Sequence, residues 1–259
     1  MEYELAIICS VALLASLLTF FSGFGLGTLL TPAFMLFFPI DTAITLTAIV
    51  HLLNNIFKSV LVGKNIDYTI LLKFGLPGIV GAFVGAKALF YFTGAGVIMK
   101  YTMGGAIFEI KLINLIIASL MILFSFFEIL PRFKQIKFGE KALIPGGALS
   151  GFFGGLSGHQ GALRSMFLIK VGLTKEAFIA TGVGIACLVD VIRLGVYFQN
   201  FESIEWDNDK IYIISATLSA FVGAYLGKKV LKKVTLDTVQ ITVAILVIML
   251  AIGLGLGIV

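Results

Sequence analysis

Charged residues are scarce in this sequence. Of its 259 residues only 13% are Asp, Glu, Lys or Arg, against about 25% in a typical soluble domain, and 59% are hydrophobic. Apolar runs such as 112–127 and 241–259 approach the roughly 20 residues that a helix needs to cross a bilayer. The sequence also lacks the ~10-residue alternating segments of a transmembrane β-barrel. We therefore predict an all-α polytopic membrane protein that is surrounded by the lipid bilayer.

Cysteine and histidine are equally rare, with two of each in the chain. Cys9 and Cys187 both fall in apolar segments and lack the spacing of metal ligands, so we expect neither a disulfide nor a metal site. No Walker motif is present, so the chain does not use ATP through a P-loop. The sequence thus predicts no cofactor.

The net charge of +5 is carried by loops and not by one continuous surface. Nucleic-acid binding requires a basic stripe or face, so we predict no nucleic-acid partner. In a membrane protein, basic loops mark the cytoplasmic side instead. Segments 228–233 (KKVLKK) and 131–141 (PRFKQIKFGEK) are therefore predicted to be cytoplasmic, and the acidic segment 201–209 (FESIEWDND) to lie outside.

The chain contains an internal repeat. AFVGA occurs at 82–86 and again at 220–224, and a related glycine-rich segment precedes each copy, FFSGFGLG at 20–27 and FFGGLSGH at 152–159. The shared order of these parts indicates a duplication. We predict a first membrane repeat over 1–130, a basic cytoplasmic linker over 131–141 and a second membrane repeat over 142–259.

Each repeat is predicted to contain one broken element and three spanning helices. The arms of 143–170 are too short to cross ~30 Å, and both flanks of this element are predicted to be cytoplasmic, so it forms a re-entrant hairpin broken near Gly158. A hairpin plus three spans inverts the second repeat relative to the first, an arrangement found in secondary transporters. Eight full spans are the alternative. The predicted elements are 5–37, 41–62, 68–90, 106–129, 143–170, 175–199, 210–227 and 237–257.

The two glycine-rich breaks are candidate anion sites. A break leaves free N–H groups at the start of the following helical arm, and these groups with the helix dipole favour an anion. Arg164 follows the second break, and a charge inside a membrane faces a cavity or a partner. For any single glycine, close helix packing is the alternative explanation. The predicted substrate-binding residues are Gly25, Gly27, Thr28, Ser157, Gly158, His159, Gln160, Gly161 and Arg164.

Two further groups of polar residues are predicted to line or gate the pathway. Asp190 and Arg193 are three residues apart on one predicted helix and can form an ion pair. The corresponding helix of the first repeat carries a polar stripe of His51, Asn54, Asn55 and Lys58. The first three are predicted to line the pathway, whereas Lys58 is predicted to be an interfacial anchor. The alternatives for Asp190 and Arg193 are a purely structural pair and a snorkelling Arg193. Cys187 is expected to be inert.

The segments around the breaks resemble the TauE/SafE family of sulfite exporters. The first motif is GFGLGTLLTP, from Gly23 to Pro32, and the second runs from GALSGFFGGLSGHQGALR onward, in a form where His159 and Gln160 replace the commoner glycine run. The resemblance covers essentially the whole chain. It implies export of sulfite, sulfonates or related sulfur anions across the bacterial cytoplasmic membrane.

The sequence thus predicts a secondary transporter for a small anion, most simply an oxidised sulfur anion, and not an enzyme. Arginine, imidazole and backbone N–H donors suit a sulfite or sulfonate group. An anion channel is one alternative. A membrane-embedded enzyme that uses His159, Asp190 or Cys187 is another, but the chain shows no nucleophile or metal constellation. The oligomeric state stays open, with a homo-oligomer as one alternative.

Overall fold

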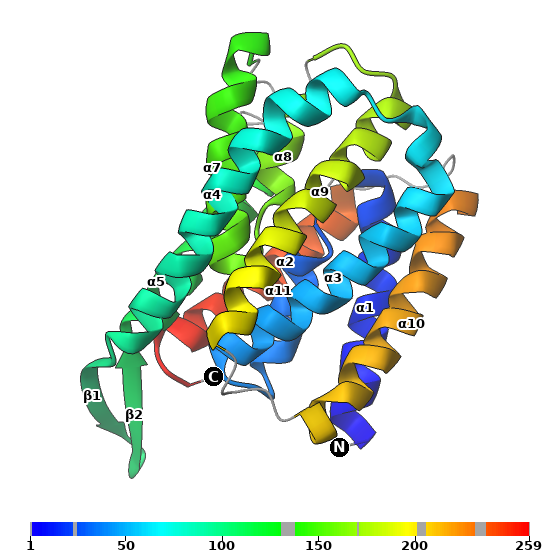
Figure 1. Ribbon diagram of the computed structural model, residues 1–259. Helices are drawn as coiled ribbons and strands as arrows, with labels where there is room; N and C mark the ends of the chain where they lie inside the picture. The colour runs from blue at the N-terminus through cyan, green and yellow to red at the C-terminus, as the bar shows by residue number, and fades with distance from the viewer. Residues whose placement is uncertain are drawn as a thin grey trace.

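Tilted helices make up almost all of the chain in the computed structural model, which describes residues 2–22, 25–130, 138–169, 171–200, 206–230 and 237–258 (Figure 1). The helices of the first half are α1 (Glu2–Ser22), α2 (Gly27–Met35), α3 (Ile40–Val62), η1 (Gly63–Asn65), α4 (Tyr68–Gly94) and α5 (Leu112–Ile129). Those of the second half are η2 (Glu140–Ala142), α7 (Leu143–Ser157), α8 (Gly161–Leu168), α9 (Lys175–Tyr197), η3 (Phe198–Asn200), α10 (Trp206–Val230) and α11 (Asp237–Gly255).

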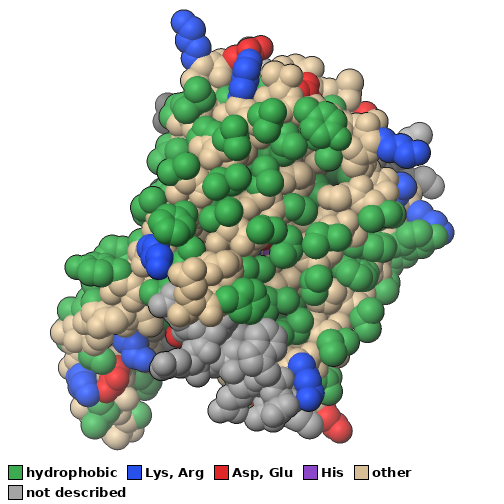
Figure 2. Space-filling model, viewed as in Figure 1, with side chains coloured by type: hydrophobic (Ala, Val, Ile, Leu, Met, Phe, Trp, Pro, Cys, Tyr) green, Lys and Arg blue, Asp and Glu red, His purple; other side chains and the backbone are tan. Residues whose placement is uncertain are grey.

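Five of the described helical segments are long and apolar enough to cross a membrane. They are Glu2–Thr19, Ile40–Asn65, Tyr68–Gly94, Lys175–Tyr197 and Asp209–Lys229. Apolar side chains cover much of the visible face, while charged side chains lie mostly toward its edges (Figure 2). This distribution is that of a protein whose middle is surrounded by lipid, and it confirms the prediction of a helical integral membrane protein.

The broken elements differ in length between the halves. The first arm of the second break, α7, has 15 residues and is about 22 Å long, which is short of the ~30 Å hydrocarbon core. The first arm of the first break, α1, has 21 residues and is about 31 Å long. The length of α7 is compatible with a re-entrant hairpin, whereas α1 is long enough to cross the bilayer completely. The re-entrant hairpins therefore stay a prediction.

A β-hairpin interrupts the predicted all-α fold. Strands β1 (Val97–Met103) and β2 (Ala106–Lys111) pair antiparallel, so the helix predicted over 106–129 begins only at Leu112. The turn residues Gly104 and Gly105 both have positive φ, as a two-residue type I′ hairpin turn requires. Tyr101 stacks on Phe108 across the strands, which are rich in β-branched and aromatic residues. The prediction of a helix over 106–129 was therefore wrong for residues 106–111.

One exposed ion pair lies on the hairpin. Lys100 Nζ is 2.5 Å from Glu109 Oε1. The hydrogen bond from Lys100, with the charge of that ammonium group, holds the pKa of Glu109 below its usual value. The hairpin projects from the end of the molecule at which α1 begins (Figure 1). Its exposed ion pair is a surface counterpart to the buried charges described below.

Each half packs its helices against the other half in a corresponding way. α4 lies along α7, and α10 lies along α1, so exchanging the halves exchanges these two contacts. The AFVGA glycines occupy corresponding positions in them: a Cβ at Gly85 would overlap the Phe152 carbonyl oxygen, and a Cβ at Gly223 would overlap the Leu13 carbonyl oxygen. The repeated glycine thus permits close approach of two helix backbones in each half.

Corresponding helices of the two halves run in opposite directions where they meet. On α3 and α9, His51 contacts Asp190 near the middle, and the Asp67 N–H beyond the end of α3 donates to Thr181 Oγ1 near the start of α9. Inverted repeats have this antiparallel relation. That the second repeat is inverted in the membrane relative to the first stays a prediction, which these contacts support. Residues 131–137, 201–205 and 231–236, which belong to the loops used to predict orientation, lie outside the described residues, as does Gly23.

Candidate functional site

The two glycine-rich breaks contact each other in the protein interior. α7 ends at Ser157 and is capped by Gly158, whose φ of +79° lies in the left-handed region that favours glycine, and α8 begins at Gly161. A Cβ at Gly27 would lie 2.9 Å from the Gly158 carbonyl oxygen, and a Cβ at Gly25 would lie 3.7 Å from Gly161 N. The glycines of both breaks therefore allow the two broken elements to cross, and the polar residues of the site surround this crossing.

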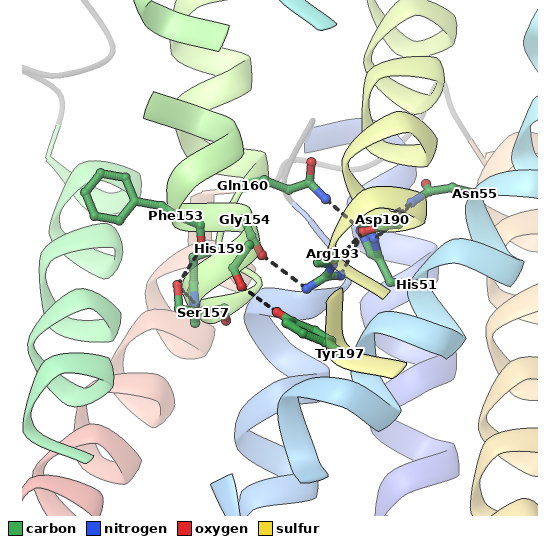
Figure 3. Close-up of polar contacts among 11 residues, drawn as sticks. His51, Asn55, Phe153, Gly154, Ser157, His159, Gln160, Asp190, Arg193 and Tyr197 are labelled. Carbon is green, nitrogen blue, oxygen red and sulfur yellow. Dashed lines mark hydrogen bonds and ion pairs between the residues drawn. The ribbon is translucent and has the colours of Figure 1, made fainter. Parts of the chain in front are cut away.

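Asp190 is the centre of a buried polar network (Figure 3). Its Oδ1 accepts hydrogen bonds from Arg193 Nε at 2.9 Å and from Gln160 Nε2 at 3.1 Å. Its Oδ2 contacts His51 Nδ1 at 2.5 Å and accepts a longer bond from Asn55 Nδ2 at 3.4 Å. All five side chains are buried. The network joins α3, α9 and the residue that precedes α8, three segments that are far apart in the sequence.

Arg193 connects this network to α7. Its Nη2 lies 2.8 Å from Asp190 Oδ1, and its Nη1 donates to the Gly154 carbonyl at 3.3 Å. One turn further along α9, the Tyr197 hydroxyl donates to the Gly155 carbonyl at 2.5 Å. Arg193 is fully buried, so the alternative that it snorkels to the membrane surface is wrong. α9 is thereby fastened to α7 by two side chains on one helical face.

A small polar cavity adjoins the network on the side of Asn55. Its volume is about 30 Å³, which is room for about one water molecule. The described residues that line it include no Asp or Glu. The polar residues in its lining are Thr19, His51, Asn55, Lys58, Arg164 and Ser165.

Two basic side chains, Arg164 and Lys58, line this cavity. Arg164 is buried, and its Nη1 has no hydrogen-bond partner in the described part of the chain. Lys58 is only 4% exposed, and its Nζ donates to Thr19 Oγ1 at 3.2 Å. Lys58 is therefore not an interfacial anchor, because its side chain is buried and bonded to Thr19 of α1. The negative charge of Asp190 is already matched by Arg193, so the cavity carries an excess of positive charge.

Some predicted site residues lie away from the cavity. The His159 ring stacks on Phe124, with ring centroids 5.8 Å apart, and its Nδ1 lies 3.0 Å from the Ser157 carbonyl oxygen. Asn54 accepts a hydrogen bond from Ser16 on α1. Thr28 is buried on α2 and is not part of the lining. The structure thus brings together His51, Asn55, Gln160, Arg164, Asp190 and Arg193, and it separates His159, Asn54 and Thr28 from them.

Sequence analysis missed two residues of this region. Tyr197 lies four residues after Arg193, so the helical period of α9 could have placed it on the same face. Thr19 contacts Lys58 across 39 positions of sequence, and no local signal indicates that contact.

In the described part of the chain, no group of three or more His, Cys, Asp or Glu side chains could hold a metal ion. Cys9 and Cys187 are free thiols. Cys187 Sγ lies 4.0 Å from Ser59 Oγ, one turn before Asp190. The described side chains at the site interact through charge and hydrogen bonds.

Membrane-crossing helices, two broken helical elements that cross and a buried cavity lined by basic side chains are features found in membrane transporters. Residues 8–255 match the profile of a family described as Sulfite exporter TauE/SafE, and the chain belongs to that family. Its members are membrane transporters and not enzymes, which confirms the prediction of a non-enzymatic function. The chain has no significant match among curated proteins or among solved structures.

Proposed function

We propose that this protein is a secondary transporter that exports a small oxidised sulfur anion, sulfite or an organic sulfonate, across the bacterial cytoplasmic membrane. The observation that carries the proposal is the buried Arg164, whose Nη1 has no hydrogen-bond partner among the described residues and which lines a cavity whose described lining includes no Asp or Glu. Burying the Arg164 charge without a full set of partners is costly unless an anion compensates it. The planar guanidinium can donate two parallel N–H bonds to the oxygens of a sulfite or sulfonate group.

The size of the cavity favours a carrier over a channel. About 30 Å³ holds roughly one water molecule, so a sulfite ion enters only if the surrounding helices move. A channel would conduct through a continuous open path. A carrier that alternates between two packed states closes its site on one side while it is accessible from the other.

The position of the cavity supports export. It lies near the start of α9, where Ile179 contributes to the lining, and near Lys58 toward the end of α3. Both of these helix ends are predicted to be cytoplasmic from the basic loops. The bonds of Arg193 and Tyr197 to α7 lie further along α9, toward the predicted outside. We expect this conformation to exchange its anion with the cytoplasmic side, which is the loading step that an exporter requires.

Proteoliposomes test the proposed function. We expect purified protein to move radiolabelled sulfite with saturable kinetics, and unlabelled sulfite on the opposite side to accelerate the exchange. Methanesulfonate, as the simplest sulfonate, is expected to compete with sulfite, whereas chloride is not, because it lacks several oxygens that accept hydrogen bonds. Sulfite flux equal to that of protein-free liposomes would refute the proposal. Flux that does not saturate and does not respond to the trans side would identify a channel.

The inverted hairpin arrangement predicts that Glu140 and Lys175 lie on the same side of the membrane. Each is replaced by cysteine in turn, in a Cys9→Ala/Cys187→Ala background, and labelled in oriented vesicles with a membrane-impermeant maleimide. We expect both to react only from the cytoplasmic side. Met103→Cys on the exposed hairpin is the control and is expected to react only from the outside. Labelling of positions 140 and 175 from opposite sides would establish that 143–170 crosses the membrane.

A further inference from the structure

His51 has a defined tautomer because of its carboxylate partner. Its Nδ1 lies 2.5 Å from Asp190 Oδ2, and an ionised carboxylate can only accept a hydrogen bond. The hydrogen therefore resides on Nδ1, and Nε2 carries the lone pair that can bind a proton. The Asn55 amide nitrogen lies 3.1 Å from Nδ1 and 3.3 Å from Nε2, and it is the hydrogen-bonding neighbour of Nε2 among the described side chains. His51 also lines the cationic cavity, so its basic nitrogen is close to the proposed anion.

The charges around His51 disfavour that proton while the cavity is empty. α9 presents Asp190, Arg193 and the Cys187 thiol, α8 presents Arg164, and α3 itself presents Lys58. Ser16 and Thr19 of α1 are uncharged, α2 has no titratable side chain, and Lys228 of α10 lies at the far end of α3, donating to the Leu61 carbonyl. Since Arg193 compensates Asp190, a proton on Nε2 would add a second positive charge beside that of Arg164. At short range in a protein interior this repulsion is strong.

An anion in the cavity reverses that balance. Its negative charge compensates Arg164, and a protonated Nε2–H can donate a hydrogen bond to one of its oxygens, whereas the neutral Nε2 lone pair repels it. We propose that His51 takes up one proton from solvent at Nε2 when the anion binds, so that proton and anion occupy the site together and cross the membrane together. This inference rests on the proposed function, because it needs an anion in the cavity.

The coupling makes anion affinity depend on pH in a stated direction. Because binding is linked to proton uptake, affinity falls as pH rises, by up to about tenfold per pH unit where His51 is neutral in the empty site and protonated in the loaded one. For a monoanion the loaded site carries no additional net charge. Transport is then expected to respond to the pH gradient across the membrane.

Calorimetry on the purified full-length protein measures the protons directly. Methanesulfonate and sulfate serve as probes because both are fully ionised near neutral pH, so every proton counted is bound by the protein. Binding heats are compared in amine buffers of different ionisation enthalpy, since sulfonate buffers would compete for the site. We expect close to one proton taken up per bound anion. Binding of either anion without proton uptake overturns the inference and leaves the proposed function intact, whereas binding of neither anion refutes both.

Nitrogen NMR identifies the residue that takes up the proton. The chain has only two histidines, so histidine-selective labelling yields two ring spectra, and the variant His159→Gln leaves that of His51 alone. We expect the His51 Nε2 signal to move to its protonated position when methanesulfonate is added. The matched calorimetric variants are His51→Gln, expected to lose the proton uptake, and His159→Gln, expected to keep it because that ring stacks on Phe124 outside the cavity lining. An Nε2 signal that does not move on anion binding overturns the assignment even if His51→Gln fails to fold.

Discussion

Arg164→Ala is expected to abolish sulfite transport while the protein still inserts and purifies normally. Arg164 is the buried cation whose Nη1 has no partner in the described part of the chain, so its removal breaks no hydrogen bond made by that atom. Each charge-assisted hydrogen bond to the anion that is lost costs about 1.5–3 kcal/mol, or about 10- to 150-fold in affinity. Removing a charge from the membrane interior also lowers the cost of insertion. The measurements are sulfite flux in proteoliposomes and thermal unfolding in detergent.

Two further variants separate charge from geometry at this position. Arg164→Lys keeps the positive charge but loses the planar fork, so we expect weakened affinity with measurable flux. Lys87→Ala removes a positive charge from the exposed face of α4 without touching the cavity, and its flux should equal that of the unmodified protein. Unimpaired transport by Arg164→Ala would remove this residue from the binding site.

Asp190→Asn and Arg193→Gln are each expected to destabilise the protein strongly, and the double variant less so. The pair is fully buried, with Arg193 Nε 2.9 Å from Asp190 Oδ1, and removing one partner of a buried pair leaves an uncompensated charge that typically costs ~3–5 kcal/mol. Replacing both partners removes both charges and can be nearly neutral. We nevertheless expect the double variant to be inactive, because Asp190 also orients His51 and Gln160. Thermal unfolding of all three variants measures the change in stability, and sulfite flux in proteoliposomes measures the change in transport.

The exposed pair of Lys100 and Glu109 is the matched control for these measurements. Its members are also close in space but lie in solvent on the hairpin, so Lys100→Gln should change stability little. A stable Asp190→Asn/Arg193→Gln protein with full transport would reduce the buried pair to a structural role. A stable but inactive one would place the pair on the transport pathway.

The sequence by itself determined the class of protein and the residues that carry its chemistry. Low charge and long apolar runs depend only on composition, and transfer into a bilayer selects for composition directly, so a helical membrane protein follows without tertiary information. The two glycine-rich breaks could likewise be predicted, because glycine allows the left-handed backbone found at Gly158 and the close approach found at Gly27. Arg164, Asp190, Arg193 and His51 stood out because charged and imidazole groups are costly in a membrane.

Only the tertiary structure decided which of these groups meet. His51 and Asp190 are 139 residues apart, and their contact depends on how the two halves pack, which no local pattern encodes. Lys58 is buried beside Thr19, although its position near a helix end predicted an anchor at the membrane interface. The His159 ring stacks on Phe124 and does not line the cavity. The hairpin over 97–111 was missed because short apolar segments have no periodicity that separates strand from helix. Hydropathy and periodicity are local properties, whereas the compensation of a buried charge is decided by residues that are distant in sequence and adjacent in space.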